Sequence, residues 1–293
     1  MTTLVQALVN ALNLGGLYAL YALGVAMVFG ILRLVNFAHS SLIMAGGYTL
    51  VFTASLPLVV RLALTVAVCV ALAMVLELVA FRGVRSAAPE TMLVTSFAVS
   101  MLLASLAESL FGALPRSTDV DPVFRESWTF GQIYLPKINA VTVVVVVVLI
   151  GGLGLFLTRT PAGLRMRAAA EDFATARLLG VAANRVISLA FAISGVLAAA
   201  AAVLLLGANG SVTPTFGFNA VLFGLIAAVV GGLSSLRGAV AGGFVLGAAS
   251  QLLQEALPVG LAPFRDALLF AAVFCLLVVR PQGLIRSGQG VRV

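Results

Sequence analysis

Long apolar segments follow one another along the chain and are separated by short polar loops. An apolar run of about 18 residues can cross the hydrocarbon core of a bilayer as a helix. Two of the segments are short, the second and the seventh, and the second meets the third at Pro57 without a polar loop. The sequence therefore predicts an all-α polytopic membrane protein with eight or nine transmembrane helices, forming a single domain over residues 1–293. The predicted segments are 4–30, 39–56, 58–81, 91–113, 138–158, 186–206, 217–233, 239–257 and 263–279.

Composition supports this class of protein. Hydrophobic residues make up 62% of the chain and charged residues 9%, whereas soluble domains carry roughly a quarter charged residues. The net charge of +7 comes almost entirely from arginines in loops and at segment ends, which is typical of topology signals and not of a nucleic-acid surface. His39 is the only histidine. With no ligand cluster visible, we expect no metal and no cofactor.

Positive charge also predicts the orientation in the membrane. The loop at about 114–137 balances its basic residues with acidic ones. Excess arginine is carried by the loop with Arg82 and Arg85, by the insert at about 159–185 and by the tail with Arg280, Arg286 and Arg292. By the positive-inside rule, the loop at about 114–137 lies outside, and the insert and the C-terminus lie in the cytoplasm. The side of the N-terminus depends on the number of spans and stays open. We call residues 159–185 the arginine-rich insert.

The arginine-rich insert has signals of helix ends. Thr160 followed by Pro161 predicts a helix start, Gly180 predicts a C-terminal cap, and Gly163 is a candidate break between two short helices. Between the ends, one face repeats at helical spacing and is formed by Met166, Ala169, Phe173, Ala176 and Leu179/Gly180. Two interpretations stay open: this face docks into a groove on a partner protein, or the helix lies in the membrane interface.

Three regions of the chain resemble one known family, in the expected order. The first holds Gly16-Leu17-Tyr18-Ala19-Leu20, Met27-Val28-Phe29-Gly30 and Asn36-Phe37-Ala38-His39. The second holds Arg167-Ala168, Glu171-Asp172, Ala176 and Gly180-Val181. The third holds Gly231-Gly232, Ser234-Ser235, Gly238-Ala239 and Gly242-Gly243. Together, in about residues 14–50, 158–195 and 216–250, they resemble the branched-chain amino acid permeases of ABC importers, the LivH-type inner-membrane subunits.

The resemblance implies a permease subunit of an ATP-driven importer for branched-chain or related hydrophobic amino acids in the bacterial inner membrane. Its expected partners are two ABC ATPase subunits, a second permease subunit (related or identical) and a periplasmic substrate-binding protein. The sequence has no GxxxxGK[ST] phosphate loop, so we expect a non-catalytic subunit with ATP hydrolysis in a separate chain.

The resemblance also implies that the arginine-rich insert is the cytoplasmic coupling segment that receives movement from the ATPases. Under that hypothesis the Phe173 face sits in the ATPase groove and polar residues make rim contacts. The residues expected to couple are Arg167, Glu171, Asp172, Phe173, Ala176 and Gly180.

Polar residues interrupt the apolar sequence between the first two segments. Unpaired polar groups are costly in hydrocarbon, so these side chains should face a cavity, a partner or the interface. One interpretation is a re-entrant piece in which Asn36, His39 and Ser40 line the translocation path. The other is a tight turn in which Asn36 caps a helix and His39 bonds a backbone carbonyl. Ser40 and Ser41 stand where the family usually has a glycine and often an acidic residue.

Two further expectations concern packing. Gly238, Gly242, Gly243 and Gly247 are spaced so that helices can cross closely. Glu77 near the end of its span is expected to form a local ion pair with Arg82.

Two other functions stay open at this point. A permease of the same architecture could carry sugars, nucleosides, urea or amides. An ion-coupled secondary transporter should show paired buried ionisable residues near the midplane, and the sequence shows almost none.

Overall fold

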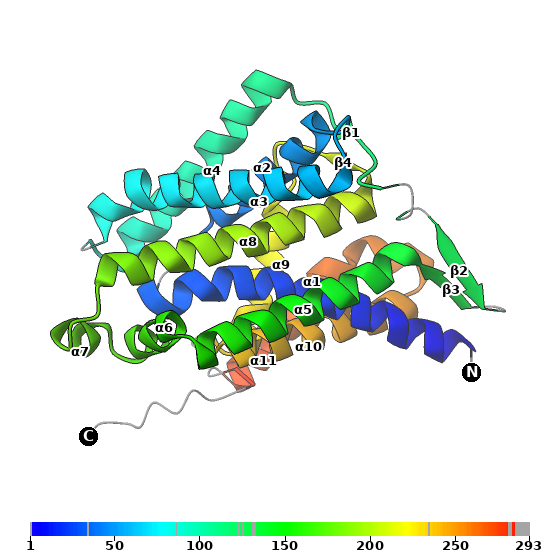
Figure 1. The fold of residues 1–293 in the computed structure, drawn as a ribbon. Coiled ribbons are helices and arrows are strands. Elements are labelled where there is room, and N and C mark those ends of the chain that lie inside the picture. The colour runs from blue at the N-terminus through cyan, green and yellow to red at the C-terminus, as the bar shows by residue number, and fades with distance from the viewer. Residues whose placement is uncertain are drawn as a thin grey trace.

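A computed structural model describes residues 2–33, 35–85, 87–121, 124, 126–130, 133–233, 235–280 and 283–284. The fold is a bundle of long helices with two small strand pairs at one end (Figure 1). The helices are α1 (Thr2–Leu32), α2 (His39–Phe52), α3 (Leu58–Leu76), α4 (Pro89–Phe111), α5 (Lys137–Arg159), α6 (Pro161–Glu171), α7 (Phe173–Leu178), α8 (Ala183–Asn209), α9 (Phe218–Gly231), α10 (Leu236–Ala256) and α11 (Arg265–Val279). A π-helical turn (Glu77–Phe81) and a 3-10 turn (Arg82–Val84) extend α3, and a 3-10 turn (Val259–Phe264) precedes α11. The strands are β1 (Arg116–Ser117), β2 (Ser127–Phe130), β3 (Ile133–Pro136) and β4 (Ser211–Val212), paired β1 with β4 and β2 with β3.

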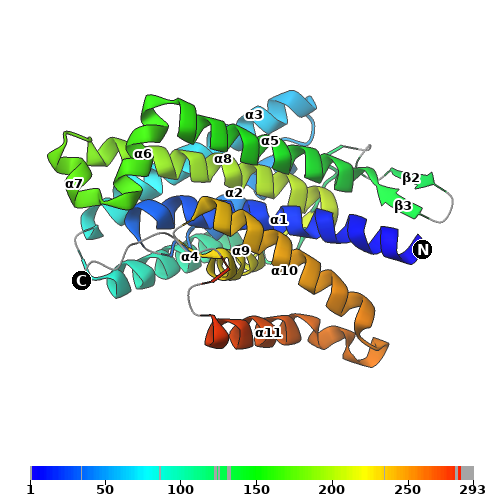
Figure 2. The same ribbon diagram turned by 90° about the horizontal axis from the view of Figure 1, so that it is seen from below.

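All nine predicted apolar segments are helical, which confirms the all-α polytopic fold. Seven described helices are long and apolar enough to cross a membrane. The other two, α2 and α9, have 14 residues each. At 1.5 Å per residue they measure about 21 Å, which is less than the hydrocarbon core of about 30 Å. Helix α9 also runs across the long helices rather than along them (Figures 1 and 2).

Helix α1 lies at the centre of the bundle, with α8, α9 and α10 against it. Glycines make this possible on the α10 side, where a Cβ on Gly243 would overlap the backbone of Ala19 and one on Gly247 the backbone of Gly15. On its other face, α10 meets α9 through Gly238 and Gly242 in the same way. Backbones that approach this closely gain extensive van der Waals contact, which is a main source of helix association in membranes.

The two polar regions of the chain lie at opposite ends of the bundle. Helices α6 and α7 of the arginine-rich insert occupy one end, and the β2–β3 hairpin extends from the other (Figure 1). The N-terminus lies at the hairpin end: Gln6 donates to the carbonyl of Tyr134 (2.9 Å) and accepts from its N–H (3.0 Å). The chain therefore starts on the side of the loop 114–137.

Arg61 holds the loop 114–137 against the bundle. Its buried guanidinium donates to the carbonyls of Val120 (2.8 Å), Leu50 (3.0 Å) and Asp119 (3.2 Å). The buried charge of Arg61 is tolerated because these backbone carbonyls take the place of water around the guanidinium. The loop is thereby fixed to the end of α2.

We predict that Gly243→Val destabilises the protein by at least about 3 kcal/mol, because the new side chain meets backbone that cannot yield. The matched control is Gly151→Val on α5, where a Cβ meets nothing within 4 Å. Thermal unfolding of the two detergent-solubilised variants measures the difference. Equal unfolding midpoints would contradict the packing described for α1 and α10.

Candidate functional site

The second predicted span is a broken span: a short non-helical segment enters the bundle before the helix α2 begins. Helix α1 ends at Leu32, and Arg33 has a left-handed backbone (φ 56°), a conformation uncommon outside glycine. The chain then turns back into the bundle, where Asn36 and Ala38 are buried before α2 begins at His39. We call residues 33–38 the return segment.

Local hydrogen bonds satisfy the polar groups of the return segment. The Asn36 side chain accepts from the Ala38 N–H (3.1 Å), and its backbone carbonyl accepts from the His39 N–H (3.3 Å). From α4, the Ser96 hydroxyl accepts from the Phe37 N–H (3.3 Å). Asn36 therefore stabilises a buried turn. It does not cap α2 as the tight-turn interpretation predicted, because the N-cap of α2 is Ala38 and has no side-chain cap.

His39 joins three helices. Its Nδ1 lies 2.9 Å from the Ser194 hydroxyl of α8, and that hydroxyl donates to the Gly24 carbonyl of α1 (3.2 Å). Serine has one hydroxyl proton, so when that proton goes to the Gly24 carbonyl, Nδ1 of His39 is the protonated nitrogen and donates to Ser194. His39 thus bonds a hydroxyl and not the backbone carbonyl that the tight-turn interpretation predicted. Its Nε2 packs against Gly24, where a Cβ would overlap the ring.

A small cavity of about 180 Å³ opens beside the start of α2. Its lining is mostly apolar. The Ser40 and Ser100 hydroxyls at its border lie 2.8 Å apart. Asn36 and His39 are not among the lining residues. Of the three residues predicted to line a path, Ser40 borders this cavity, and the other two hold the return segment. The lining residues are Ser40, Ser41, Ser100, Met101, Ala104, Pro214, Thr215, Gly217 and Phe218.

The arginine-rich insert forms two short helices, as predicted, but they meet at a different residue. The Thr160 side chain caps α6 by accepting from the Gly163 N–H (3.0 Å), which confirms the predicted start. The break lies at Asp172, whose carboxylate accepts from the Thr175 N–H (3.0 Å) and caps α7. Gly163 instead lies in the first turn of α6, packed against the backbone of α5. A capping side-chain acceptor at Asp172 outweighs the flexibility of glycine.

Gly180 ends α7, as predicted. Its backbone is left-handed (φ 84°), its N–H donates to the Arg177 carbonyl (3.1 Å), and the Val181 N–H donates to the Ala176 carbonyl (3.0 Å). This pair of bonds is the Schellman arrangement, which satisfies the last carbonyls of a helix.

The repeating face of the insert points inward, which corrects the expected docking face. Met166, Ala169 and Ala176 are buried, and Phe173 is half-buried against the core of the chain. The face recurs at helical spacing because α6 and α7 pack on their own bundle. Ala176 and Phe173 therefore present little surface to a partner.

The outer face of the insert is mixed in character. Arg167, Glu171 and Asp172 are exposed, as rim contacts require. Leu178 and Leu179 are 88% and 81% exposed. The helical period placed Leu179 with the repeating face, which is wrong because α7 ends at Leu178, and it did not identify Leu178. Their signal in the sequence is a pair of leucines directly before a capping glycine in a polar segment.

The return segment and the insert touch directly. The Arg33 guanidinium donates to the Ala170 carbonyl of α6 (3.0 Å). The broken span and the exposed insert are therefore adjacent at the same end of the bundle.

Membrane-length helices around a broken span, with a two-helix insert at one end, define a polytopic membrane permease. The sequence model of the family described as branched-chain amino acid transport system / permease component matches residues 7–279. The chain belongs to this family.

Individual relatives agree with the family. The chain is 33% identical to the high-affinity branched-chain amino acid transport system permease protein BraD of Pseudomonas aeruginosa, over 96% of this chain and 95% of that protein. It is 32% identical to the corresponding LivH protein of Escherichia coli, over 96% and 94%. A shorter stretch is 40% identical to the autoinducer 2 import system permease protein LsrC of an Enterobacter species, over 28% and 24%.

We predict that Gly24→Ala displaces His39, because the added methyl group overlaps the imidazole. His39 is the only histidine, so modification by diethyl pyrocarbonate in a protein with a histidine-free tag reports on this ring. The native ring should be protected and the Gly24→Ala ring reactive, with stability lowered by about 1–3 kcal/mol.

Gly30→Ala is the matched control in the same helix, since a Cβ there meets nothing within 4 Å. Modification of native His39 at the rate of free imidazole would contradict the buried position of the ring.

Proposed function

We propose that this chain is a permease subunit of an ATP-driven ABC importer for branched-chain or related hydrophobic amino acids. The observation that carries the proposal is the family match across residues 7–279, together with relatives named for branched-chain amino acid transport over nearly the whole chain. The location that follows is the bacterial inner membrane.

The proposed orientation puts the arginine-rich insert and the C-terminus in the cytoplasm. The insert carries excess arginine, which favours the cytoplasmic side, and lies opposite the loop 114–137 (Figure 1). The N-terminus, bonded to Tyr134, would then lie outside. The predicted tail arginines Arg286 and Arg292 lie outside the described residues. A periplasmic binding protein would approach from the side of the loop 114–137.

The proposed contact with an ATPase subunit is the outer face of the insert. Exposed leucines bury apolar surface when they enter a partner's groove, and Arg167, Glu171 and Asp172 supply polar contacts around them. Leu178 and Leu179 take the anchoring role that the sequence had assigned to Phe173. Gly180 serves by fixing the turn that presents them.

For the translocation path, we propose that Ser40 contacts the substrate from the small cavity beside the start of α2, whose mostly apolar lining suits a hydrophobic side chain. Hydroxyl groups can both donate and accept, so they suit the charged ends of an amino acid. Asn36 and His39 would act indirectly by holding the return segment. A second permease subunit, identical or related, would complete the path, and the glycines of α10 would keep each bundle rigid against its partner.

Ion-coupled transport is less well supported. Among the described spans, the charged or basic side chains that are buried are few. Arg61 donates to backbone carbonyls, Glu77 pairs with Arg85, and His39 bonds Ser194. The partial likeness to LsrC favours, as a second candidate, the same architecture carrying another small solute.

Leu178→Arg should weaken binding of the ATPase subunit at least about tenfold, because it places a charge where an apolar anchor is expected. The test is affinity purification of the tagged chain in mild detergent, with mass spectrometry of the proteins that co-purify. Leu114→Arg is the matched control, since that leucine is 81% exposed in the loop at the opposite end.

An ABC ATPase recovered with the native chain and with Leu114→Arg, but lost with Leu178→Arg, supports both the class and the contact. Equal recovery with all three chains would refute the contact alone. A well-folded native chain that brings down no ATPase would refute the proposed function.

A further inference from the structure

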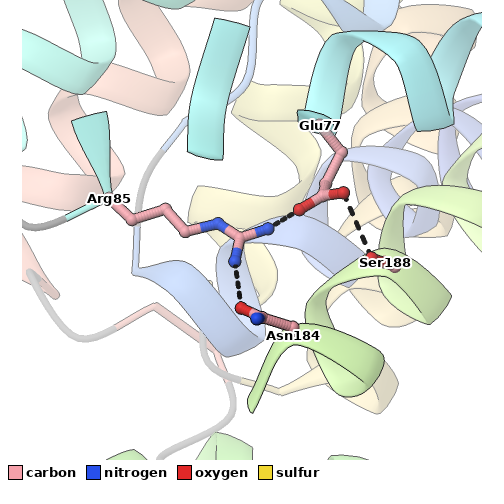
Figure 3. Close-up of polar contacts among 4 residues, drawn as sticks. All are labelled: Glu77, Arg85, Asn184 and Ser188. Atoms are coloured by element: carbon pink, nitrogen blue, oxygen red, sulfur yellow. Dashed lines mark hydrogen bonds and ion pairs between the residues drawn. The ribbon is translucent and has the colours of Figure 1, made fainter. Parts of the chain in front are cut away.

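Four polar residues link α3 to α8 at the end of the bundle that carries the insert (Figure 3). Glu77 forms an ion pair with Arg85 and accepts from the Ser188 hydroxyl (3.1 Å), and Arg85 donates to the Asn184 side chain (2.8 Å). The sequence had predicted Arg82 as the partner of Glu77, but the chain beyond Glu77 leaves α-helical geometry and brings Arg85 to it instead. We call Glu77, Arg85, Asn184 and Ser188 the inner polar cluster.

The inner polar cluster is unusually well buried for charged groups. The Glu77 side chain is 1% exposed and that of Arg85 15%. Desolvation opposes burial of an ion pair, and an apolar replacement often stabilises a fold as well or better. The ion pair therefore adds little net stability to the contact between α3 and α8. The better-attested use of a buried ion pair is to fix one relative arrangement of the helices that carry it.

Apolar contacts already hold α3 and α8 together beside the cluster. Phe81 and Phe191 are fully buried with ring centroids 5.4 Å apart. Nearer the middle of α8, Gly195 lies against the backbone of Cys69 and Val70. Adhesion between the two helices does not depend on the ion pair.

The backbone at the cluster is a joint between rigid elements. Helix α3 changes to a π-helical turn at Glu77–Phe81 and to a 3-10 turn at Arg82–Val84. Such turns have poorer hydrogen-bond geometry than an α-helix and often mark functional sites or hinges. Glu77 and Arg85 thus lie at the two ends of the segment that contains both turns, and a hinge at this segment would change its length or direction.

The other half of the cluster lies directly after the arginine-rich insert. Helix α8 begins at Ala183, three residues beyond the cap at Gly180. Asn184 and Ser188 are four residues apart, so both face the cluster from the first turns of α8. A displacement of α6 and α7 must pass through these turns before it reaches the rest of α8.

We propose that the inner polar cluster passes movement of the arginine-rich insert to α3, so that Glu77 and Arg85 are positioning residues that couple ATP hydrolysis to import. This inference rests on the proposed function. When the insert moves, α8 carries Asn184 and Ser188 with it, and the ion pair obliges the turn after α3 to follow. Without the charges, apolar contacts still hold the two helices together, but nothing polar fixes the turn after α3 to the first turns of α8.

The test uses the complete complex, with its ATPase subunits and binding protein, reconstituted in liposomes. Four quantities are measured: co-purification of the ATPase, the thermal unfolding midpoint, ATP hydrolysed, and substrate imported. The variants are Glu77→Gln, which leaves Arg85 buried without its partner charge, and the double variant Glu77→Gln with Arg85→Gln, which removes both charges. Glu90→Gln is the matched control, since Glu90 is exposed in the first turn of α4.

We expect both cluster variants to retain the ATPase but to import about tenfold less substrate per ATP hydrolysed, a typical size for a coupling between sites. The double variant should regain thermal stability relative to the single variant and yet stay uncoupled. If the ion pair served only to stabilise the fold, the double variant would regain both its thermal stability and its ratio of substrate imported to ATP hydrolysed. A double variant with the native ratio of substrate to ATP would therefore overturn the proposal.

If the charge variants fail to accumulate, the double variant Asn184→Ala with Ser188→Ala is tested instead, because it leaves the ion pair intact and removes both of its hydrogen bonds to α8. It should lower the ratio of substrate to ATP about fivefold, the lower end of such couplings, and an unchanged ratio would overturn the proposal. Failure of the proposed function has a separate signature: the native chain itself would recover no ATPase.

Discussion

The close approach of backbones at α1 is the constraint on which the rest of the structure depends. Within hydrocarbon there is little hydrophobic force between helices, so association relies on dense packing and on internal hydrogen bonds. Helix α1 can lie at the centre because Gly243 and Gly247 of α10, and Gly224 of α9, have no side chain where they meet it. Gly24 of α1 itself leaves the space that His39 fills. In the proposed function, the closely packed centre of α1, α9 and α10 is the fixed part relative to which the arginine-rich insert moves.

The broken span follows from the same need to satisfy polar groups. A return segment inside the bundle exposes backbone N–H and C=O groups that no helix pairs, and these are costly unless they find partners. Ser96 of α4, Ser194 of α8 and the Asn36 side chain supply or organise these partners. The segment is tied to the insert through the bond from Arg33 to Ala170. The proposed movement of the insert would therefore reach both α2, through the return segment, and α3, through α8.

Much of the architecture could be predicted from the sequence, because spans, capping residues and glycine spacings are local patterns. Thr160 and Gly180 marked the helix ends correctly for this reason. The direction of the insert could not be predicted: periodicity reveals that Ala176 lies on an apolar face, but not whether that face meets the chain's own helices or a partner. The partners of His39 and Glu77 were missed because Ser194 and Ser188 lie more than a hundred residues away. Serines within apolar helices have no local pattern that identifies such contacts.

The central claim is that this chain imports a hydrophobic amino acid at the expense of ATP hydrolysed by a partner. The most direct measurement is uptake of labelled leucine into liposomes that contain the purified complex, with the binding protein on the outside and ATP on the inside. The account predicts uptake that requires internal ATP and the binding protein and that proceeds without any ion gradient. Uptake driven by a sodium or proton gradient in the absence of ATP would contradict it.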